Sequence, residues 1–271
     1  MSSMPLTGKS VRLARLSRPG DDRFLFVPLD HSVSDGPVAT AAGFGDLVRS
    51  ITDGGADGVV VHKGRARMIA PALFTRCSLV VHLSASTAHG PDVNAKVLVG
   101  DVEEAVRLGA DAVSVHVNIG SDTESEQLAD LGAVAAACDR FGMPLIAMIY
   151  PRGPRVTDPT DPTLVAHVVN IAADLGVDII KTVLATPPER MEEVIASSPL
   201  PVVVAGGGST DRSLHDFAVT AMDLGCAGLA VGRRVFTSPS PEKAVRELAS
   251  IIHRRALTSE PAPQTEMAGV L

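Results

Sequence analysis

Short runs of β-branched and other apolar residues recur along the whole chain, and this repetition constrains the fold more than any other feature. Each run ends in polar or glycine residues, and a segment with helical spacing of apolar residues follows it. The runs are Phe24 to Leu29, Gly58 to His62, Leu79 to Leu83, Ala112 to Val117, Leu145 to Tyr150, Asp178 to Thr182, Val202 to Ala205 and Gly228 to Val231. Eight alternating units predict an α/β fold, a single (β/α)8 TIM barrel over residues 1–256 with an N-terminal lead-in segment.

An open, doubly wound sheet is the alternative fold, and the absence of a complete nucleotide fingerprint weakens it. Gly8-Lys9-Ser10 resembles the end of a phosphate-binding P-loop, but Ser3 replaces the required first glycine. The run that begins at Gly206 has Asp211 in place of the third glycine of GxGxxG. Neither motif supports a nucleotide enzyme.

The segments between the runs carry their own structural signals. A capping aspartate, early acids and a final glycine predict a helix over Asp101–Gly109, and a second helix is expected over Leu164–Leu175. The run Lys96–Val99 is either an extra edge strand or part of a loop. Residues 257–271, rich in proline, threonine and alanine, are expected to form a disordered tail.

Charge and composition narrow the classes of partner. The 271 residues include 24 Lys plus Arg and 31 Asp plus Glu, a net charge of -7, which disfavours nucleic acid and anionic membranes as partners. No apolar signal core and no 18-residue apolar run is present, so we expect neither secretion nor membrane spanning. Cys77, Cys138 and Cys226 form no paired motif, which favours a reduced, cytoplasmic location.

Functional side chains gather where the predicted strands end, which is where barrels of this kind carry their chemistry. The residues at these positions are Asp30, His31, His62, Lys63, His82, His116, Tyr150, Arg152, Lys181, Gly206 to Gly208, Gly232, Arg233 and Arg234. We therefore expect the active site at this end of the barrel.

Lys181 is the sharpest of these signals because it interrupts the apolar run Val177–Leu184, where a charged ammonium is costly to desolvate. An amine that is partly neutral can attack a ketone and form a Schiff base, which turns the carbonyl into an electron sink. The structural alternative is a strand-end lysine that is paired with an acid or reaches solvent.

Tyr150 and Asp30 are the candidate proton-transfer groups. Tyr150 is the one tyrosine in a chain without tryptophan, so it is not an interchangeable aromatic filler. A phenol and a carboxylate beside an iminium can exchange protons with the substrate. Each also has a structural alternative, because Tyr150 could plug the barrel rim and Asp30 could cap a turn.

The last two strand ends predict a phosphate site. Gly206, Gly207 and Gly208 follow one strand, Gly232 and Arg233 follow the next, and barrels commonly hold phosphate at these turns. The alternative is a pair of tight turns followed by solvated arginines.

Histidines offer a competing, metal-dependent chemistry. His31, His62, His82 and His116 follow strands, and imidazoles at a barrel mouth can bind zinc or iron. However, there is no HxH pair or HExxH helix, and acidic ligands are sparse. We therefore predict no metal and no cofactor, with His31 tuning the substrate site and the other three histidines forming hydrogen bonds within the strand ends.

Eight strings taken together resemble the DhnA-type class I aldolases, the family of archaeal-type fructose-bisphosphate aldolase and 2-amino-3,7-dideoxy-D-threo-hept-6-ulosonate synthase. The strings are VPLDHS, VVVHKG, VHLSAST, GADAVSVHVNIGS, AMIYPRGP, DIIKT, VVVAGGGS and GLAVGRRVF, and they span about Arg12 to Arg254. The resemblance implies a Schiff-base lysine at Lys181, a tyrosine acid/base at Tyr150 and the strand-one aspartate at Asp30. It also implies phosphate contacts at Gly206, Gly207, Gly232 and Arg233.

The substrate expected from the resemblance follows from two local differences. Fructose-bisphosphate aldolases usually carry a tryptophan shortly before the tyrosine, whereas this chain has AMIY. The heptulosonate synthases usually continue Asn-Tyr-Thr-Gly after the lysine and threonine, whereas this chain continues from Val183 to Glu189 without them. These differences favour the secondary-metabolic branch that joins L-aspartate 4-semialdehyde to dihydroxyacetone phosphate on the way to 3-amino-4-hydroxybenzoate.

The expected partners are therefore a phosphorylated ketone and an amino-acid aldehyde. Arg152 and Arg155 are candidate ligands of the aldehyde's α-carboxylate, and the alternative is that they only decorate a proline-rich loop. The resemblance also implies a homo-oligomer, of which a decamer is one form. The alternatives are the heptulosonate synthase reaction and fructose-bisphosphate cleavage, a metal-dependent barrel hydrolase or lyase, and a sugar-phosphate-binding protein without activity.

Overall fold

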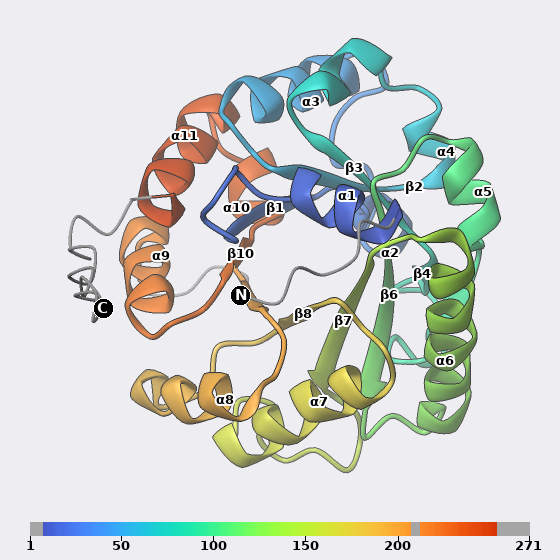
Figure 1. Cartoon of the computed structure of the whole chain (residues 1–271), viewed down its shortest axis with the longest axis vertical. Coiled ribbons are helices and arrows are strands. Elements are labelled where there is room, and N and C mark those ends of the chain that lie inside the picture. Colours follow the sequence, from blue (N-terminus) through green and yellow to red (C-terminus); the bar gives the residue numbers. More distant parts are fainter. Residues whose placement is uncertain (1–7, 207–211, 254–271) are drawn as a thin grey trace, which may run out of the picture.

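The computed structural model describes residues 8–206 and 212–253, and in this part of the chain eight parallel strands close into a barrel surrounded by helices (Figure 1). The barrel strands are β1 (Phe24–Pro28), β2 (Gly58–His62), β3 (Ser78–His82), β6 (Ala112–Ile119), β7 (Leu145–Pro151), β8 (Ile179–Thr182), β9 (Val202–Ala205) and β10 (Gly228–Ala230). They pair in the closed order β1-β10-β9-β8-β7-β6-β3-β2. The predicted barrel is confirmed, and the open sheet is excluded.

Helices follow the strands and cover the outside of the barrel. They are α1 (Gly8–Arg15), α2 (His31–Ser34), α3 (Phe44–Asp53), α4 (Lys63–Ala66), α5 (Val102–Arg107), α6 (Glu124–Phe141), α7 (Pro162–Asp174), α8 (Met191–Ser197), α9 (Leu214–Asp223), α10 (Arg233–Phe236) and α11 (Pro241–Ile252), with 3-10 turns η1 (Pro71–Thr75) and η2 (Pro188–Arg190). The two helices expected from sequence are α5 and α7. In α5 the Asp101 carboxylate accepts a hydrogen bond from the Glu104 amide at 2.7 Å, as its capping role predicts.

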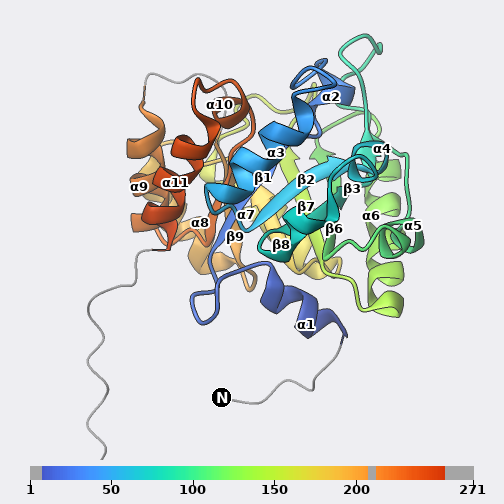
Figure 2. The ribbon, with the colours of Figure 1, turned by 90° about the horizontal axis from the view of Figure 1, so that it is seen from above.

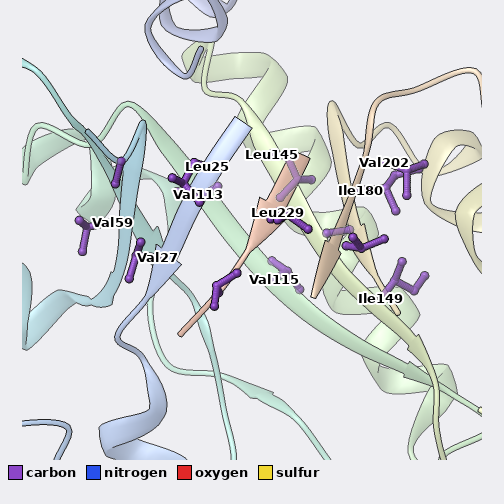
Figure 3. Close-up of a cluster of buried hydrophobic side chains, with 14 of the residues drawn as sticks. Leu25, Val27, Val59, Val113, Val115, Leu145, Ile149, Ile180, Val202 and Leu229 are labelled. Carbon is purple, nitrogen blue, oxygen red and sulfur yellow. The ribbon is translucent and has the colours of Figure 1, made fainter. Parts of the chain in front are cut away.

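The strands are buried on both faces and thereby form two apolar layers. Figure 3 shows members of the outer layer, such as Val59, Val113 and Val202, which pack under the helices. The inner layer fills the barrel with side chains that include Phe26, Met148 and Val203. Burial on both faces explains why the strands are almost continuously apolar.

One device recurs where helices turn back into strands at the amino end of the barrel. Asp57, Asp111 and Asp178 each precede a strand, and each accepts a hydrogen bond from a backbone N–H of the neighbouring strand. These bonds are 2.7 to 3.1 Å long and go to Leu25, Leu79 and Leu145. The repeated pairing helps to fix strand register.

Helix α1 closes the amino end of the barrel, opposite the end where α2 and α10 lie (Figure 2). Arg12 donates a 2.8 Å hydrogen bond to the Gly142 carbonyl, and Leu16, just after α1, is fully buried in the inner layer. Lys9, part of the incomplete P-loop motif, forms ion pairs with Asp139 and Asp178. This motif therefore has a structural role far from the strands' carboxyl ends.

A small hairpin projects from the barrel after β3. Strand β4 (Ser84–Ala85) pairs antiparallel with β5 (Val97–Leu98), so the run Lys96–Val99 is an edge strand, one of the two predicted alternatives. The expected tail, residues 257–271, lies outside the described residues. Within those residues, none of the helices combines the length and the apolar character needed to span a lipid bilayer.

Candidate active site

A cavity of about 550 Å³ opens at the carboxyl ends of the barrel strands. Its walls come from most of the barrel: Asp30 and His31 follow β1, His62 and His82 end β2 and β3, and His116 lies on β6. Further lining residues are Lys96, Tyr150, Arg152, Val183, Gly206, Gly232 and Arg233. The structure therefore brings together most of the predicted site residues.

Lys181 faces the interior of the barrel, one layer below the residues that line the cavity. On β8 it pairs in register with Met148 and Val203, which both belong to the inner apolar layer. Its Nζ donates a 3.6 Å hydrogen bond to the Met148 Sδ, and 9% of the residue is exposed. Because a thioether is a weak acceptor, this bond leaves the amine available to a better partner.

Asp30 is an acidic residue of the cavity wall that lies beside His31 and His82. Burial alone would raise the pKa of its carboxyl, but the charges of His82, Lys181, His31 and His62 outweigh it and lower the pKa to about 2. Asp30 is therefore ionised at neutral pH, and its carboxylate interacts electrostatically with Lys181.

Two polar atoms beside the cavity have no hydrogen bond within the described residues. They are Asp30 Oδ1 and His31 Nδ1, which lie 3.4 Å apart without hydrogen-bond geometry. Buried polar atoms are normally paired, so these two mark a place that a polar ligand would complete. Desolvation lowers the pKa of His31, which favours its neutral form.

His82 connects Asp30 to strand β6. Its Nε2 lies 3.8 Å from Asp30 Oδ2, and its Nδ1 forms a 2.8 Å hydrogen bond with the Ser114 hydroxyl. Burial is the main cause that lowers the pKa of His82 to about 4, so the ring is neutral at neutral pH.

Tyr150 lines the cavity two residues beyond Met148 on β7, one layer nearer the mouth than Lys181. Its ring lies 5.1 Å from the His116 ring, and the Arg152 guanidinium carbon lies 4.9 Å from the ring centroid. Tyr150 is 94% buried, with 6% of its surface exposed. These contacts hold the Tyr150 phenol in place, one layer nearer the cavity mouth than Lys181.

The predicted phosphate side is described in part. Gly207 and Gly208 lie outside the described residues. The Gly206 N–H donates a 2.9 Å hydrogen bond to the Ala230 carbonyl of the neighbouring strand. Gly206 therefore lines the cavity, while its N–H takes part in the hydrogen bonding of the barrel. A Cβ at Gly232 would lie 2.6 Å from His31 Cε1, so glycine is needed for this close approach.

Sequence reasoning missed Lys96 and overvalued Arg155. Lys96 comes from the hairpin next to β5, is half-buried, and lines the cavity. Arg155 lies 3.6 Å from Asp122, and the structure does not bring it into the cavity. Spacing along the chain could not show either result, because both depend on how loops fold over the barrel mouth.

The histidines at the strand ends do not form a metal-ligand cluster. Among residues 8–206 and 212–253, no group of three or more His, Cys, Asp or Glu side chains has the geometry to hold a metal ion. His116 Nε2 instead hydrogen-bonds Asn118 Oδ1 at 2.9 Å, and His82 bonds Ser114. These two rings have the hydrogen-bonding role expected from sequence.

Comparison with curated proteins gives relatives over almost the whole chain. The chain is 51% identical over 247 residues to 2-amino-4,5-dihydroxy-6-oxo-7-(phosphonooxy)heptanoate synthase of Streptomyces griseus, covering 90% of each protein. It is 40% identical over 247 residues to 2-amino-3,7-dideoxy-D-threo-hept-6-ulosonate synthase of Halobacterium salinarum, covering 91% of this chain and 92% of that protein.

Solved structures agree with these relatives. A Schiff base-forming fructose-1,6-bisphosphate aldolase superposes with a TM-score of 0.82 at 26% identity, covering 90% of this chain and 100% of the other. An archaeal fructose-1,6-bisphosphate aldolase with its catalytic lysine bound to a carbinolamine gives a TM-score of 0.81 at 27% identity, covering 90% and 99%.

A family model matches the whole barrel. Residues 24–238 fit the model of the DeoC/LacD family aldolases, from the first residue of β1 to just beyond α10. The family match, the curated relatives and the solved structures all agree with the site geometry. The chain belongs to the DeoC/LacD family of aldolases and is a class I, Schiff-base aldolase.

Proposed function

We propose that this aldolase joins L-aspartate 4-semialdehyde to dihydroxyacetone phosphate and forms 2-amino-4,5-dihydroxy-6-oxo-7-(phosphooxy)heptanoate. The 51% identity to the Streptomyces griseus synthase supports the choice of substrates. The observation that carries the chemistry is the placement of Lys181 inside the barrel, below a cavity lined by Tyr150 and Asp30.

Lys181 is the proposed nucleophile. Its amine attacks the ketone carbon of dihydroxyacetone phosphate, and loss of water from the carbinolamine leaves an iminium. Because the iminium is positive, the ionised Asp30 that interacts with the Lys181 charge also stabilises the intermediate. Removal of a proton from the carbon that bears the free hydroxyl then gives an enamine.

The enamine carbon attacks the aldehyde of the acceptor, and the new alkoxide takes up a proton. A carboxyl with a pKa of about 2 is a poor acid near neutral pH, so Tyr150 is the favoured proton donor to the alkoxide. Water then hydrolyses the iminium, which releases the seven-carbon product and restores the Lys181 amine.

The donor phosphate is assigned to the turns after β9 and β10. Gly232 and Arg233 line the cavity there, and Gly206 leaves room beside them. Gly207 and Gly208 belong to the same predicted site. Anchoring the phosphate at these turns would hold the ketone carbon near Lys181 and reduce the entropy lost in reaching the transition state.

The loop after Lys181 supports an acceptor different from that of the heptulosonate synthases. Val183 lines the cavity where that group usually has asparagine, and residues 184–187 lead into η2. An apolar side chain there removes a hydrogen-bonding group from the cavity wall.

Mass spectrometry of products from a substrate panel tests this function. Incubation with dihydroxyacetone phosphate and L-aspartate 4-semialdehyde should yield the seven-carbon phosphorylated amino acid. Preferred formation of fructose 1,6-bisphosphate from glyceraldehyde 3-phosphate would contradict the proposal and favour the sugar aldolase reaction. Binding of dihydroxyacetone phosphate without any product would favour a protein that binds sugar phosphates without catalysis.

Cellular location and assembly belong to the same proposal. The three cysteines are free and buried, and burial raises the pKa of each thiol, which suits a reducing, cytoplasmic environment. The family resemblance supports a homo-oligomer, of which a decamer is one form. Light scattering coupled to size-exclusion chromatography would measure the oligomeric state.

A further inference from the structure

We infer that Lys96, Arg152 and His116 form a subsite for the amino-acid end of the acceptor, in which the two cations hold the α-carboxylate and His116 accepts a hydrogen bond from the α-ammonium group. This inference rests on the proposed function and assigns residues that determine its acceptor specificity. These three residues are called the acceptor subsite below.

The first observation is a pair of cations in the cavity that lack acidic partners. Lys96 and Arg152 both line the cavity, and among the described residues no carboxylate forms an ion pair with either side chain. By contrast, Lys63 and Arg67, outside the cavity, form ion pairs with Glu104 at 2.9 and 3.1 Å. Lys96 Nζ donates to the Ser86 hydroxyl, and the Arg152 guanidinium lies over the Tyr150 ring.

The energetics of these two cations favour an anionic ligand. Burial lowers the pKa of Lys96, the Arg152 guanidinium lowers it further, and more weakly acting carboxylates raise it. A carboxylate bound between Lys96 and Arg152 would offset both causes, because it adds negative charge where two positive charges repel one another. An anion bound at this part of the cavity wall would therefore be stabilised by both cations.

The backbone that carries Lys96 is held firmly against the barrel. The Asn94 carbonyl accepts hydrogen bonds from Asn118 Nδ2 at 2.9 Å and from Gln127 Nε2 at 2.8 Å. The Gln127 side chain is 1% exposed, and its Oε1 accepts a 2.8 Å hydrogen bond from the backbone N–H of Asn118. This network ties the hairpin to β6 and α6, so Lys96 has a defined position at the cavity wall.

The second observation concerns the hydrogen bonding of His116. Since Asn118 Nδ2 donates to the Asn94 carbonyl, Asn118 Oδ1 faces His116 and accepts from the ring's Nε2–H at 2.9 Å. Burial is the main cause that lowers the pKa of His116 well below its usual value, so the ring carries one proton. Nδ1 is then a lone-pair acceptor, and it has no hydrogen bond within the described residues. An ammonium group is a matching donor.

The third observation is the position of this wall within the barrel. In the closed strand order, β9, β8 and β7 separate β10 from β6 on one side, and β1, β2 and β3 separate them on the other. Arg233 after β10 and His116 on β6 are therefore on opposite sides of the mouth. The proposed product carries a phosphate at one end and a carboxylate at the other, which matches cations on both sides with Lys181 between them.

Four acceptors separate the roles of the carboxylate and the ammonium group. L-aspartate 4-semialdehyde has both, succinic semialdehyde has the carboxylate, 3-aminopropanal has the ammonium group, and propanal has neither. Steady-state kinetics with each aldehyde and dihydroxyacetone phosphate would be measured for the full-length protein and its Lys96→Met and His116→Phe variants. Lys243→Met on the exposed face of α11 is the matched control.

The subsite predicts a selective pattern. Lys96→Met should raise KM about tenfold or more for the two acceptors that carry a carboxylate, because a charge-assisted hydrogen bond is lost, with little effect on propanal. His116→Phe should raise KM for the two acceptors that carry an ammonium group. Lys243→Met should leave all four values unchanged.

Two results would overturn the subsite. One is an equal change of KM, or no change, for all four acceptors in Lys96→Met. The other is a preference for glyceraldehyde 3-phosphate over L-aspartate 4-semialdehyde that Lys96→Met abolishes, since the cations would then bind phosphate. Borohydride trapping of dihydroxyacetone phosphate alone on each variant confirms folding and tests Schiff-base formation separately from acceptor binding. Failure of the proposed function would appear in the products of the unsubstituted protein, whatever the variants do.

Discussion

At the scale of single residues, the titratable groups of the site differ in whether they are charged at neutral pH. Asp30 keeps its negative charge at neutral pH because interactions with neighbouring basic side chains outweigh burial and lower its pKa to about 2. His31, His62, His82 and His116 lose theirs because burial dominates, which lowers the pKa of each ring. The site therefore pairs an anion and a lysine amid neutral imidazoles, which suits iminium chemistry.

Tyr150 is predicted to be the principal proton donor. Tyr150→Phe keeps the ring contacts with His116 and Arg152 but removes the hydroxyl, so kcat should fall by about 10²- to 10⁴-fold with little change in donor binding. Turnover under saturating substrates and the Kd for dihydroxyacetone phosphate would be measured. An unchanged kcat would exclude the acid/base role.

His82 is predicted to make the protein less stable in mild acid. Its pKa of about 4 in the folded state lies below the usual 6.5, so the unfolded chain binds more protons between these values. The free energy of unfolding contributed by His82 is complete above pH 6.5 and falls as the pH drops toward 4, by up to about 3 kcal/mol.

The variant His82→Gln isolates this contribution because an amide retains a partner for Ser114 without titrating. Urea unfolding of both proteins at pH 7 and pH 4.5 should show a smaller loss of stability in the variant. Equal losses in the two proteins would contradict the assigned pKa, since the other histidines are present in both.

At the scale of elements, the turn from β10 into α10 requires a residue without a side chain, which is Gly232. A Cβ at Gly232 would lie 2.6 Å from His31 Cε1 and 2.7 Å from the Pro28 carbonyl oxygen. Gly232→Ala should therefore displace α10 or His31, lower the free energy of unfolding by about 1–3 kcal/mol, and raise KM for dihydroxyacetone phosphate.

Gly45→Ala in α3 is the control for this substitution, because nothing lies within 4 Å of its added methyl group. Alanine in a helix is favoured over glycine, so this variant should gain about 0.5–1 kcal/mol. Thermal unfolding and steady-state kinetics of both variants would be compared. If Gly232→Ala were as stable and active as Gly45→Ala, the close approach would have no functional importance.

The elements also show which features the sequence could predict. The barrel strands were predictable because apolar runs buried on both faces are distinctive, and polar or glycine residues end each run. The β4–β5 hairpin was uncertain because two residues per strand give almost no periodic signal.

The residues of the candidate site also divide into those that could be selected from the sequence and those that could not. Lys181, Tyr150 and Asp30 could be selected from strand ends alone, since strand order and side-chain alternation place them together. Lys96 could not, because its position depends on hydrogen bonds from Asn118 and Gln127 to the Asn94 carbonyl, which link segments far apart in the sequence.

At the scale of the whole molecule, the barrel supplies its own electron sink. In the proposed mechanism, a Schiff base at Lys181 does the work that a metal ion does in other aldol reactions, which is to stabilise the electron pair of the reacting carbon. Activity should therefore persist after dialysis against EDTA, with kcat within about twofold of the untreated protein. Loss of activity that zinc or iron restores would instead support the alternative histidine-metal site.

The central claim is that Lys181 carries the substrate, and reductive trapping tests it most directly. Sodium borohydride added with dihydroxyacetone phosphate should reduce the iminium and attach the mass of the reduced donor to the peptide that contains Lys181. Lys181→Met should abolish the modification, while Lys243→Met should retain it. Attachment to a different lysine, or no attachment in a folded protein that forms product, would contradict the account.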